Sequence, residues 1–177
     1  MNKTHLLREI IIKTDFYNDH NELFEYLVHQ VKWESSLRAR KTASFGIPYN
    51  YSNMAYEYCE FPKEILIAKE LVDIEVGYTS NNCLVNYYDT PESSMGFHSD
   101  NIELLENGTG IAILSLGSMR VMRFSNKINP EITIDFTLNK GSFFYMSKEI
   151  QAFWKHAILK EQNAQERISL TFRKIKE

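Results

Sequence analysis

The stretch RISLTFR, residues 167–173, alternates polar and apolar side chains without a break. Because neighbouring side chains of a β-strand point to opposite faces, this pattern predicts a strand with one polar and one apolar face. Ile168, Leu170 and Phe172 require a hydrophobic core. The arginine-bearing face then lies either in solvent or inside a barrel, where guanidinium groups would bind carboxylates, since an unpaired buried charge is unfavourable.

Six more segments of the second half are short, rich in β-branched or aromatic residues and separated by Gly, Asn, Pro and Ser. They are Leu84–Tyr88, Ile111–Leu116, Arg120–Phe124, Ile132–Leu138, Ser142–Met146 and His156–Leu159. The first half predicts a short strand at Leu6–Lys13, a helix beginning at Asn18 or Asp19, and a helix from Pro62 to a stop near Gly77. Helices followed by strands predict an α+β protein whose core is a sandwich or jelly roll, with the helices packed on one sheet.

The composition is that of one soluble domain covering 1–177, with 44% hydrophobic residues and a net charge of −3. We expect a helical part at about 1–80 and a strand-rich core at about 81–175. Cys59 and Cys83 form no disulfide framework and are expected to be buried free thiols. With no apolar run of membrane length and no signal peptide, we expect a cytoplasmic protein without membrane partners. The near-neutral charge argues against binding nucleic acid mainly by electrostatics.

A metal site is predicted around His98 and Asp100, which are two residues apart in the segment GFHSD. On an extended backbone the two side chains point to the same side and can share one ion. His156, at the start of a predicted strand, is available as a third ligand. Two histidines and one carboxylate on one face of an octahedral ion leave three positions open, as in non-haem Fe(II) oxygenases. Taken singly, each of these residues has an ordinary structural explanation.

Asn86 and Tyr88 share one strand face by the same two-residue period and can add hydrogen bonds to such a site. An iron with three open positions, next to arginines that bind carboxylates, suggests a dicarboxylate co-substrate that also chelates the metal.

These motifs together resemble the AlkB-type Fe(II)/2-oxoglutarate-dependent dioxygenases, from about residue 38 to residue 174. The matching pieces occur in the family's order: RKTASFG (40–46) with YNYS (49–52), NYY (86–88), HSD (98–100), ILSLG (113–117), Gly141-Ser142 with Met146, His156, and RISLTFR (167–173). The resemblance implies a double-stranded β-helix, that is, a jelly roll, with the site inside its mouth. It also implies oxidative decarboxylation of 2-oxoglutarate with O2, which yields succinate and CO2. Hydroxylation of an N-methyl group then releases formaldehyde.

Carried over residue by residue, the resemblance assigns Fe(II) to His98, Asp100 and His156. Arg167, helped by Tyr88, would pair with the distal carboxylate of 2-oxoglutarate. Arg173 and Asn86 would lie near the chelating end. Ser169 stands where many members have asparagine, and its hydroxyl can still bond the co-substrate.

The resemblance implies a substrate site at Tyr49 and Tyr51, which match the lid aromatics that stack on a flipped base opposite the iron histidine. Base-repair members commonly have an acidic residue two positions after the metal aspartate. This chain has Ile102 there, followed by Glu103.

Two functions follow as alternatives: demethylation of alkylated nucleobases, with single strands favoured over duplex DNA, and hydroxylation or oxidation of a small metabolite or amino acid. Lys32, Arg38, Arg40 and Lys41 form a basic cluster that would either meet phosphates or be solvated. The sequence leaves the oligomeric state open.

Overall fold

The computed structural model describes residues 2–37, 39–50 and 55–176. Its helices are α1 (Lys3–Arg8), α2 (His20–Gln30) and α3 (Lys63–Val76), with short 3-10 helices η1 (Ile102–Leu104) and η2 (Glu149–Ala152). Its strands are β1 (Ile10–Lys13), β2 (Lys41–Gly46), β3 (Asn82–Tyr88), β4 (Met95–His98), β5 (Gly110–Gly117), β6 (Arg120–Asn126), β7 (Thr133–Leu138), β8 (Phe143–Ser147), β9 (Trp154–Ile158) and β10 (Arg167–Arg173).

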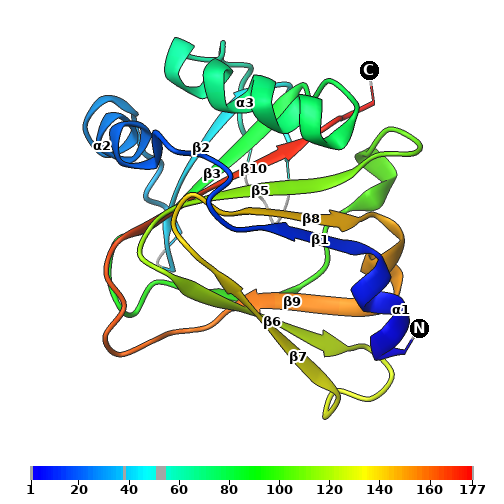
Figure 1. The fold of residues 1–177 in the computed structure, drawn as a ribbon. Helices are drawn as coiled ribbons and strands as arrows, with labels where there is room; N and C mark the ends of the chain where they lie inside the picture. The colour runs from blue at the N-terminus through cyan, green and yellow to red at the C-terminus, as the bar shows by residue number, and fades with distance from the viewer. Residues whose placement is uncertain (1, 38, 51–54, 177) are drawn as a thin grey trace.

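Two antiparallel sheets form the body of the protein, and Figure 1 shows them one above the other. The major sheet has the order β1-β8-β5-β10-β3-β2 and the minor sheet the order β4-β9-β6-β7. β10 lies between β3 and β5, with Ser169 opposite both Asn86 and Ser115. This arrangement confirms the expected α+β jelly roll and puts the RISLTFR strand at the centre of the larger sheet.

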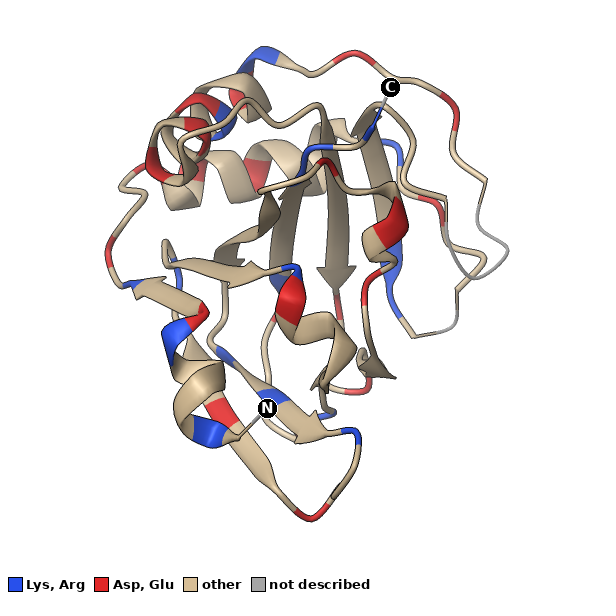
Figure 2. Ribbon diagram, turned by 90° about the vertical axis from the view of Figure 1, so that its right-hand side faces the viewer, with Lys and Arg blue, Asp and Glu red and all other residues tan. Residues whose placement is uncertain are grey.

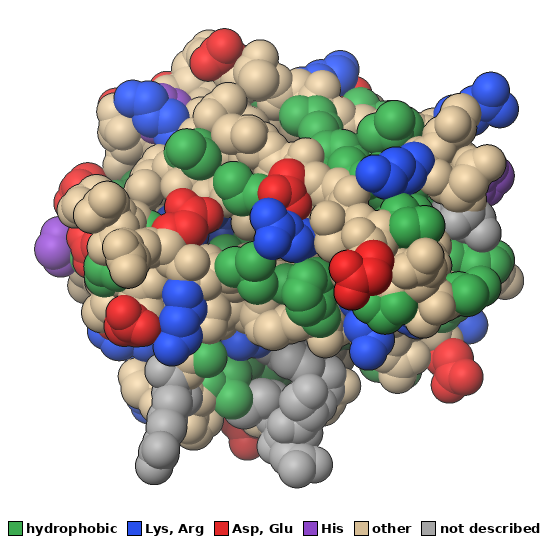
Figure 3. All heavy atoms as spheres, turned by 90° about the horizontal axis from the view of Figure 1, so that it is seen from below, with side chains coloured by type: hydrophobic (Ala, Val, Ile, Leu, Met, Phe, Trp, Pro, Cys, Tyr) green, Lys and Arg blue, Asp and Glu red, His purple; other side chains and the backbone are tan. Residues whose placement is uncertain are grey.

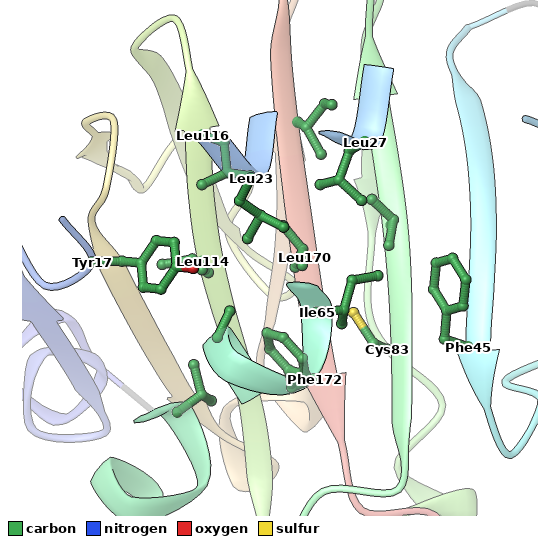
Figure 4. Close-up of a cluster of buried hydrophobic side chains, with 14 of the residues drawn as sticks. Tyr17, Leu23, Leu27, Phe45, Ile65, Cys83, Leu114, Leu116, Leu170 and Phe172 are labelled. Atoms are coloured by element: carbon green, nitrogen blue, oxygen red, sulfur yellow. The ribbon is translucent and has the colours of Figure 1, made fainter. Parts of the chain in front are cut away.

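The helices α2 and α3 cover the outer face of the major sheet (Figure 1). The apolar side chains of β10, Ile168, Leu170 and Phe172, are fully buried in this helix–sheet core. Figure 4 shows Leu23 and Leu27 of α2 and Ile65 of α3 pointing toward β10 and its neighbours. α3 ends as expected at Gly77, whose φ of 74° lies in the left-handed region that glycine adopts without strain.

A second core fills the space between the two sheets. It includes Phe124 and Phe136 from the minor sheet and Phe144 from the major sheet, with ring centroids between 5.4 and 6.2 Å apart. The polar side chains of β10 face this same interior, because they lie on the strand face opposite the helix–sheet core. The arginine face is therefore inside the barrel and not in solvent.

The structure differs from the sequence expectations mainly in the first half. Leu6 lies in α1 and not in a strand, so the N-terminal strand begins only at Ile10. β1 and β2 form the two edges of the major sheet, so the sheet extends across the expected division near residue 80. Cys83 is buried as expected, but Cys59 is exposed. None of the described helices has the length and apolar character needed to cross a membrane.

Candidate metal and co-substrate site

Two histidines of the minor sheet face each other across the β4–β9 pair. His98 ends β4 and is directly opposite His156 on β9, with the ring centroids 4.2 Å apart. Side chains at opposite positions of antiparallel strands point to the same face of the sheet. The pairing register therefore places both imidazoles on one wall of the barrel interior. The Nδ1 atom of His98 lies 2.9 Å from the carbonyl oxygen of Gly96, which fixes the orientation of the ring.

Asp100 completes this group from the segment just after β4. One ligand atom from each of His98, Asp100 and His156 lies within 4.8 Å of the other two. Asp100 is held firmly: Arg173 Nη2 donates to its Oδ1 at 2.5 Å, and its backbone N–H donates to Gln151 Oε1 at 3.0 Å. The Tyr49 hydroxyl lies 3.4 Å from the same Oδ1. The carboxylate is therefore oriented before any ion is bound.

The charge state of the group suits a metal ion. Burial opposes the ionisation of Asp100, but the neighbouring charges, Arg173 first, outweigh it and lower its pKa to about 2. Burial, together with the neighbouring His98, lowers the pKa of His156 to about 3, so this imidazole is neutral at neutral pH. The pKa of His98 is also lowered, mainly by burial. An ionised carboxylate and two neutral imidazoles are the protonation states that a metal requires.

Orphaned atoms in the same group support this fit. Asp100 Oδ2 and His156 Nδ1 are buried and have no hydrogen-bond partner among the described residues. Asp100 Oδ2 lies 3.5 Å from the other imidazole nitrogen, His156 Nε2, so one ion could bind to both of these atoms. Two imidazoles and a carboxylate are the donor set of Fe(II) in facial-triad oxygenases. The residues present therefore fit the ion that the sequence predicts.

A cavity extends from this group to the centre of the major sheet. Its lining includes the polar face of β10 and, from β3, the expected residues Asn86 and Tyr88. Arg167, at the inner end, is 1% exposed and lies 5.2 Å from the Tyr88 ring, and its Nη2 donates to Ser115 Oγ at 3.0 Å. Its Nε and Nη1 atoms are buried without a partner among the described residues. A carboxylate that enters the cavity would satisfy them.

Burial, opposed in part by Tyr88, lowers the pKa of Arg167 to about 10, which still leaves its guanidinium charged at neutral pH. The cavity thus has a metal-ligand group at one end and a buried cation at the other. A dicarboxylate that chelates the metal and reaches Arg167 would satisfy both.

The expected substrate residues are distributed unevenly. Tyr49 is 3% exposed; its hydroxyl accepts from the backbone N–H of Asn101 at 2.7 Å, and its ring lies 4.1 Å from the Arg173 guanidinium. Tyr49 therefore packs against Asp100 and Arg173. Tyr51 lies outside the described residues. Ile102 is half-buried against the barrel core, and Glu103 is exposed. Ile102 and Glu103 are not part of the cavity lining.

Three residues to which sequence reasoning assigned no role in the site contact residues of the cavity lining. Arg40, expected in a basic cluster, is 7% exposed and donates from Nε to Asn86 Oδ1 at 2.7 Å. Gln151 of η2 holds the Asp100 backbone, and nothing in its local sequence signals this role. Arg120 is buried beside Tyr88. A signal for Arg120 exists, because it precedes Met122 and Phe124 on the inward face of one strand.

Of the rest of the basic cluster, Lys32 is exposed to solvent. Lys41 pairs with Asp89 at 2.8 Å, and residue 38 lies outside the described ranges.

A jelly roll with this metal-ligand group and a buried arginine defines the class of non-haem Fe(II) oxygenases that use a dicarboxylate. Comparisons with known proteins agree. The model of the 2OG-Fe(II) oxygenase superfamily matches residues 2–173. The "alpha-ketoglutarate-dependent dioxygenase alkB homolog 3" of Bos taurus is 30% identical over 175 residues, which cover 88% of this chain and 61% of that protein.

The "DNA oxidative demethylase ALKBH2" of Bos taurus is 27% identical over 153 residues, covering 81% of this chain and 55% of the relative. The solved structure of OsALKBH1 matches the fold with a TM-score of 0.71 at 13% identity, covering 94% of this chain and 98% of that one. The chain belongs to the AlkB-type Fe(II)/2-oxoglutarate-dependent dioxygenases. This family uses Fe(II), 2-oxoglutarate and O2. The chain spans 55–61% of the length of the two Bos taurus relatives.

Proposed function

We propose that this protein oxidatively demethylates N-alkylated nucleobases in single-stranded DNA or RNA, with release of succinate, CO2 and formaldehyde. The observation that carries the proposal is a second cavity on the Tyr49 side of the metal-ligand group. It shares Leu84, Met95, His98, Asp100 and Arg173 with the first cavity, and the rest of its lining is Tyr49, Ser99 and Asn101. The metal would thus lie between a co-substrate cavity and a separate place for the atom that is oxidised.

Each part of the chain has a distinct task in this proposal. His98, Asp100 and His156 hold Fe(II), which supplies the oxidation of a C–H bond when O2 and 2-oxoglutarate are present. Arg167, supported by Tyr88 and Ser169, binds the distal carboxylate, and Asn86 and Arg173 lie beside the metal. Arg173 and Tyr49 hold Asp100 in place. Hydroxylation of an N-methyl carbon gives a hemiaminal, which breaks down to formaldehyde and the unmodified base.

The charge is unevenly distributed over the chain. Helices α2 and α3 together with Asp19 contain seven carboxylates and two lysines, a net charge of −5 within a chain of −3. The remaining residues carry a net +2, which becomes −1 once the buried Asp100 and the four buried arginines (Arg40, Arg120, Arg167 and Arg173) are left out. Figure 2 shows acidic residues on the helices above the sheet, and Figure 3 shows charges of both signs interspersed on the face seen from below. Such a surface is compatible with a short single strand that enters by stacking and few phosphate contacts.

The alternative, oxidation of a small metabolite or amino acid, is favoured by the position of Tyr49. Tyr49 is 3% exposed, its hydroxyl contacts Asp100 and Asn101, and its ring lies 4.1 Å from the Arg173 guanidinium, so little of the ring is accessible for stacking on a base. The same Fe(II) and 2-oxoglutarate chemistry would then act on a compact ligand in the second cavity.

The deciding experiment reconstitutes the protein anaerobically with Fe(II) and 2-oxoglutarate, then admits O2 and follows succinate and formaldehyde. Single-stranded DNA and RNA oligonucleotides with one N-methylated base are compared with their unmethylated forms and with a panel of free amino acids and metabolites. We expect stoichiometric formaldehyde and succinate with a methylated strand only. Stimulated succinate formation with a free metabolite, and none with any methylated strand, would reject the proposal in favour of the alternative.

A further inference from the structure

Arg120, the first residue of β6, is completely buried, which is unusual for an arginine. Its Nη2 atom donates to the carbonyl oxygen of Ser93 at 3.0 Å and also to that of Leu159. Its guanidinium lies 5.6 Å from the centre of the Tyr88 ring. One side chain of the minor sheet therefore contacts two connecting segments and a residue of the major sheet.

The two carbonyl groups belong to segments that position the metal ligands. Ser93 lies in the turn just before β4, which ends at His98, and Leu159 follows β9, which carries His156. Arg120 therefore ties the start of one ligand strand to the end of the other. Both hydrogen bonds come from a charged donor and are therefore stronger than bonds between neutral groups.

Tyr88 connects Arg120 to the co-substrate cavity, because it lines the cavity and its ring lies beside the Arg120 guanidinium. Two guanidinium groups approach its ring, Arg120 at 5.6 Å and Arg167 at 5.2 Å. Each guanidinium group is attracted to the face of the Tyr88 ring, but the two positive charges repel one another. In agreement, Arg120 contributes to the lowered pKa of Arg167, after burial.

The local charge is not balanced by the protein. Glu161 lies 3.5 Å from Arg120 Nε, but one third of its side chain is exposed and the same oxygen accepts from the Val121 backbone N–H. Arg120 retains Nε and Nη1 without a hydrogen-bond partner among the described residues, and Arg167 retains the same two atoms. Two buried cations with unpaired donors create a strongly positive end of the cavity. An anion that binds there gains from both charges.

We propose that Arg120 is a positioning residue for 2-oxoglutarate: it fixes Tyr88 and, through its charge, strengthens the binding of the distal carboxylate beside Arg167. Arg120 is not part of the cavity lining, so it acts through Tyr88 and through its field and not by direct contact. The proposal rests on the co-substrate chemistry of the family and on the role of Arg167. It does not depend on whether the substrate is a nucleobase.

The test is calorimetric titration of the Mn(II)-loaded protein with two ligands, in the absence of O2. 2-Oxoglutarate has the distal carboxylate, and 2-oxobutyrate chelates the metal in the same way but lacks it. For Arg120→Met we expect about tenfold weaker binding of 2-oxoglutarate, equivalent to about 1.4 kcal/mol, and unchanged binding of 2-oxobutyrate. Arg120→Lys, which keeps the charge but not the planar guanidinium group, should restore part of the loss.

Arg123→Met is the matched control, because Arg123 lies on the same strand but is exposed and pairs with Asp135 at 2.7 Å. It should bind both ligands like the unchanged protein. If Arg120→Met does not fold, Arg120→Gln replaces it, since its amide can still donate to one carbonyl while the charge is removed. Equal weakening of both ligands in the folded Met or Gln variant would assign Arg120 a merely structural role. Unchanged binding of 2-oxoglutarate would overturn the proposal outright.

Discussion

His98 and His156 are directly paired across β4 and β9, and their imidazole rings lie 4.2 Å apart. Residues far apart in the sequence thus become neighbours on one wall of the barrel. Asp100 follows two residues after His98, the last residue of β4, and accepts a hydrogen bond from Arg173 of the opposite sheet. The metal-ligand group consequently depends on both sheets.

Asp100→Ala should abolish coupled formation of succinate and formaldehyde, because it removes the carboxylate of the metal-ligand group, to which Arg173 donates a hydrogen bond. Mn(II) affinity, measured by calorimetry, should fall by more than the roughly 10–100-fold that loss of an outer-shell partner costs. Asp135→Ala, which removes an exposed carboxylate paired with Arg123, is the control and should leave Mn(II) affinity unchanged. A fully active Asp100→Ala variant would refute the triad.

Tyr49→Phe should weaken metal binding without removing it. The hydroxyl that contacts Asp100 and accepts from Asn101 is lost, while the ring under Arg173 remains. We expect Mn(II) affinity to fall by up to about tenfold and stability to fall by about 1 kcal/mol. Tyr58→Phe, at a residue that is 65% exposed, should change neither quantity. An unchanged Mn(II) affinity in Tyr49→Phe would show that the hydroxyl does not orient Asp100.

Arg167→Met should chiefly raise the 2-oxoglutarate requirement. The guanidinium is buried at the inner end of the cavity, with two nitrogen atoms unpaired among the described residues. Loss of a charged hydrogen-bond pair of about 2.7 kcal/mol would raise the KM for 2-oxoglutarate roughly 100-fold. The kcat at saturating 2-oxoglutarate should fall much less. Steady-state succinate formation measures both constants, and an unchanged KM would exclude the anchoring role.

Gly46→Ala should destabilise the fold more than Gly77→Ala, although both glycines have a φ of 74°. A Cβ atom at Gly77 meets nothing within 4 Å, so only the backbone strain of about 1–2 kcal/mol remains. A Cβ atom at Gly46 would lie 2.1 Å from the carbonyl oxygen of Asn81, which adds about 1–3 kcal/mol of overpacking. Chemical unfolding of both variants compares the two. Equal losses would mean that the end of β2 can move away from Asn81.

The elements that the sequence predicted well are those with a local physical cause. α3 follows from Pro62 at its start and Gly77 at its end, and β10 follows from strict alternation. Leu6 was misplaced because a run of apolar residues does not distinguish a short helix from a strand. β2 and β4 were not predicted, because β2 is half polar and β4 contains Gly96. Both segments are strands because a neighbouring strand supplies their backbone hydrogen bonds.

The sequence by itself determined the chemistry of the cavity: the alternation in RISLTFR puts arginine on one strand face, and the HSD segment supplies two candidate ligands. Only the tertiary structure decided which partners those groups meet. Arg40, which the sequence places in a basic cluster, is buried against Asn86 of β3, and Arg120 is buried against Tyr88 of the same strand. The physical reason is that strand periodicity sets the face of a side chain, whereas the pairing of strands from distant segments sets its neighbours.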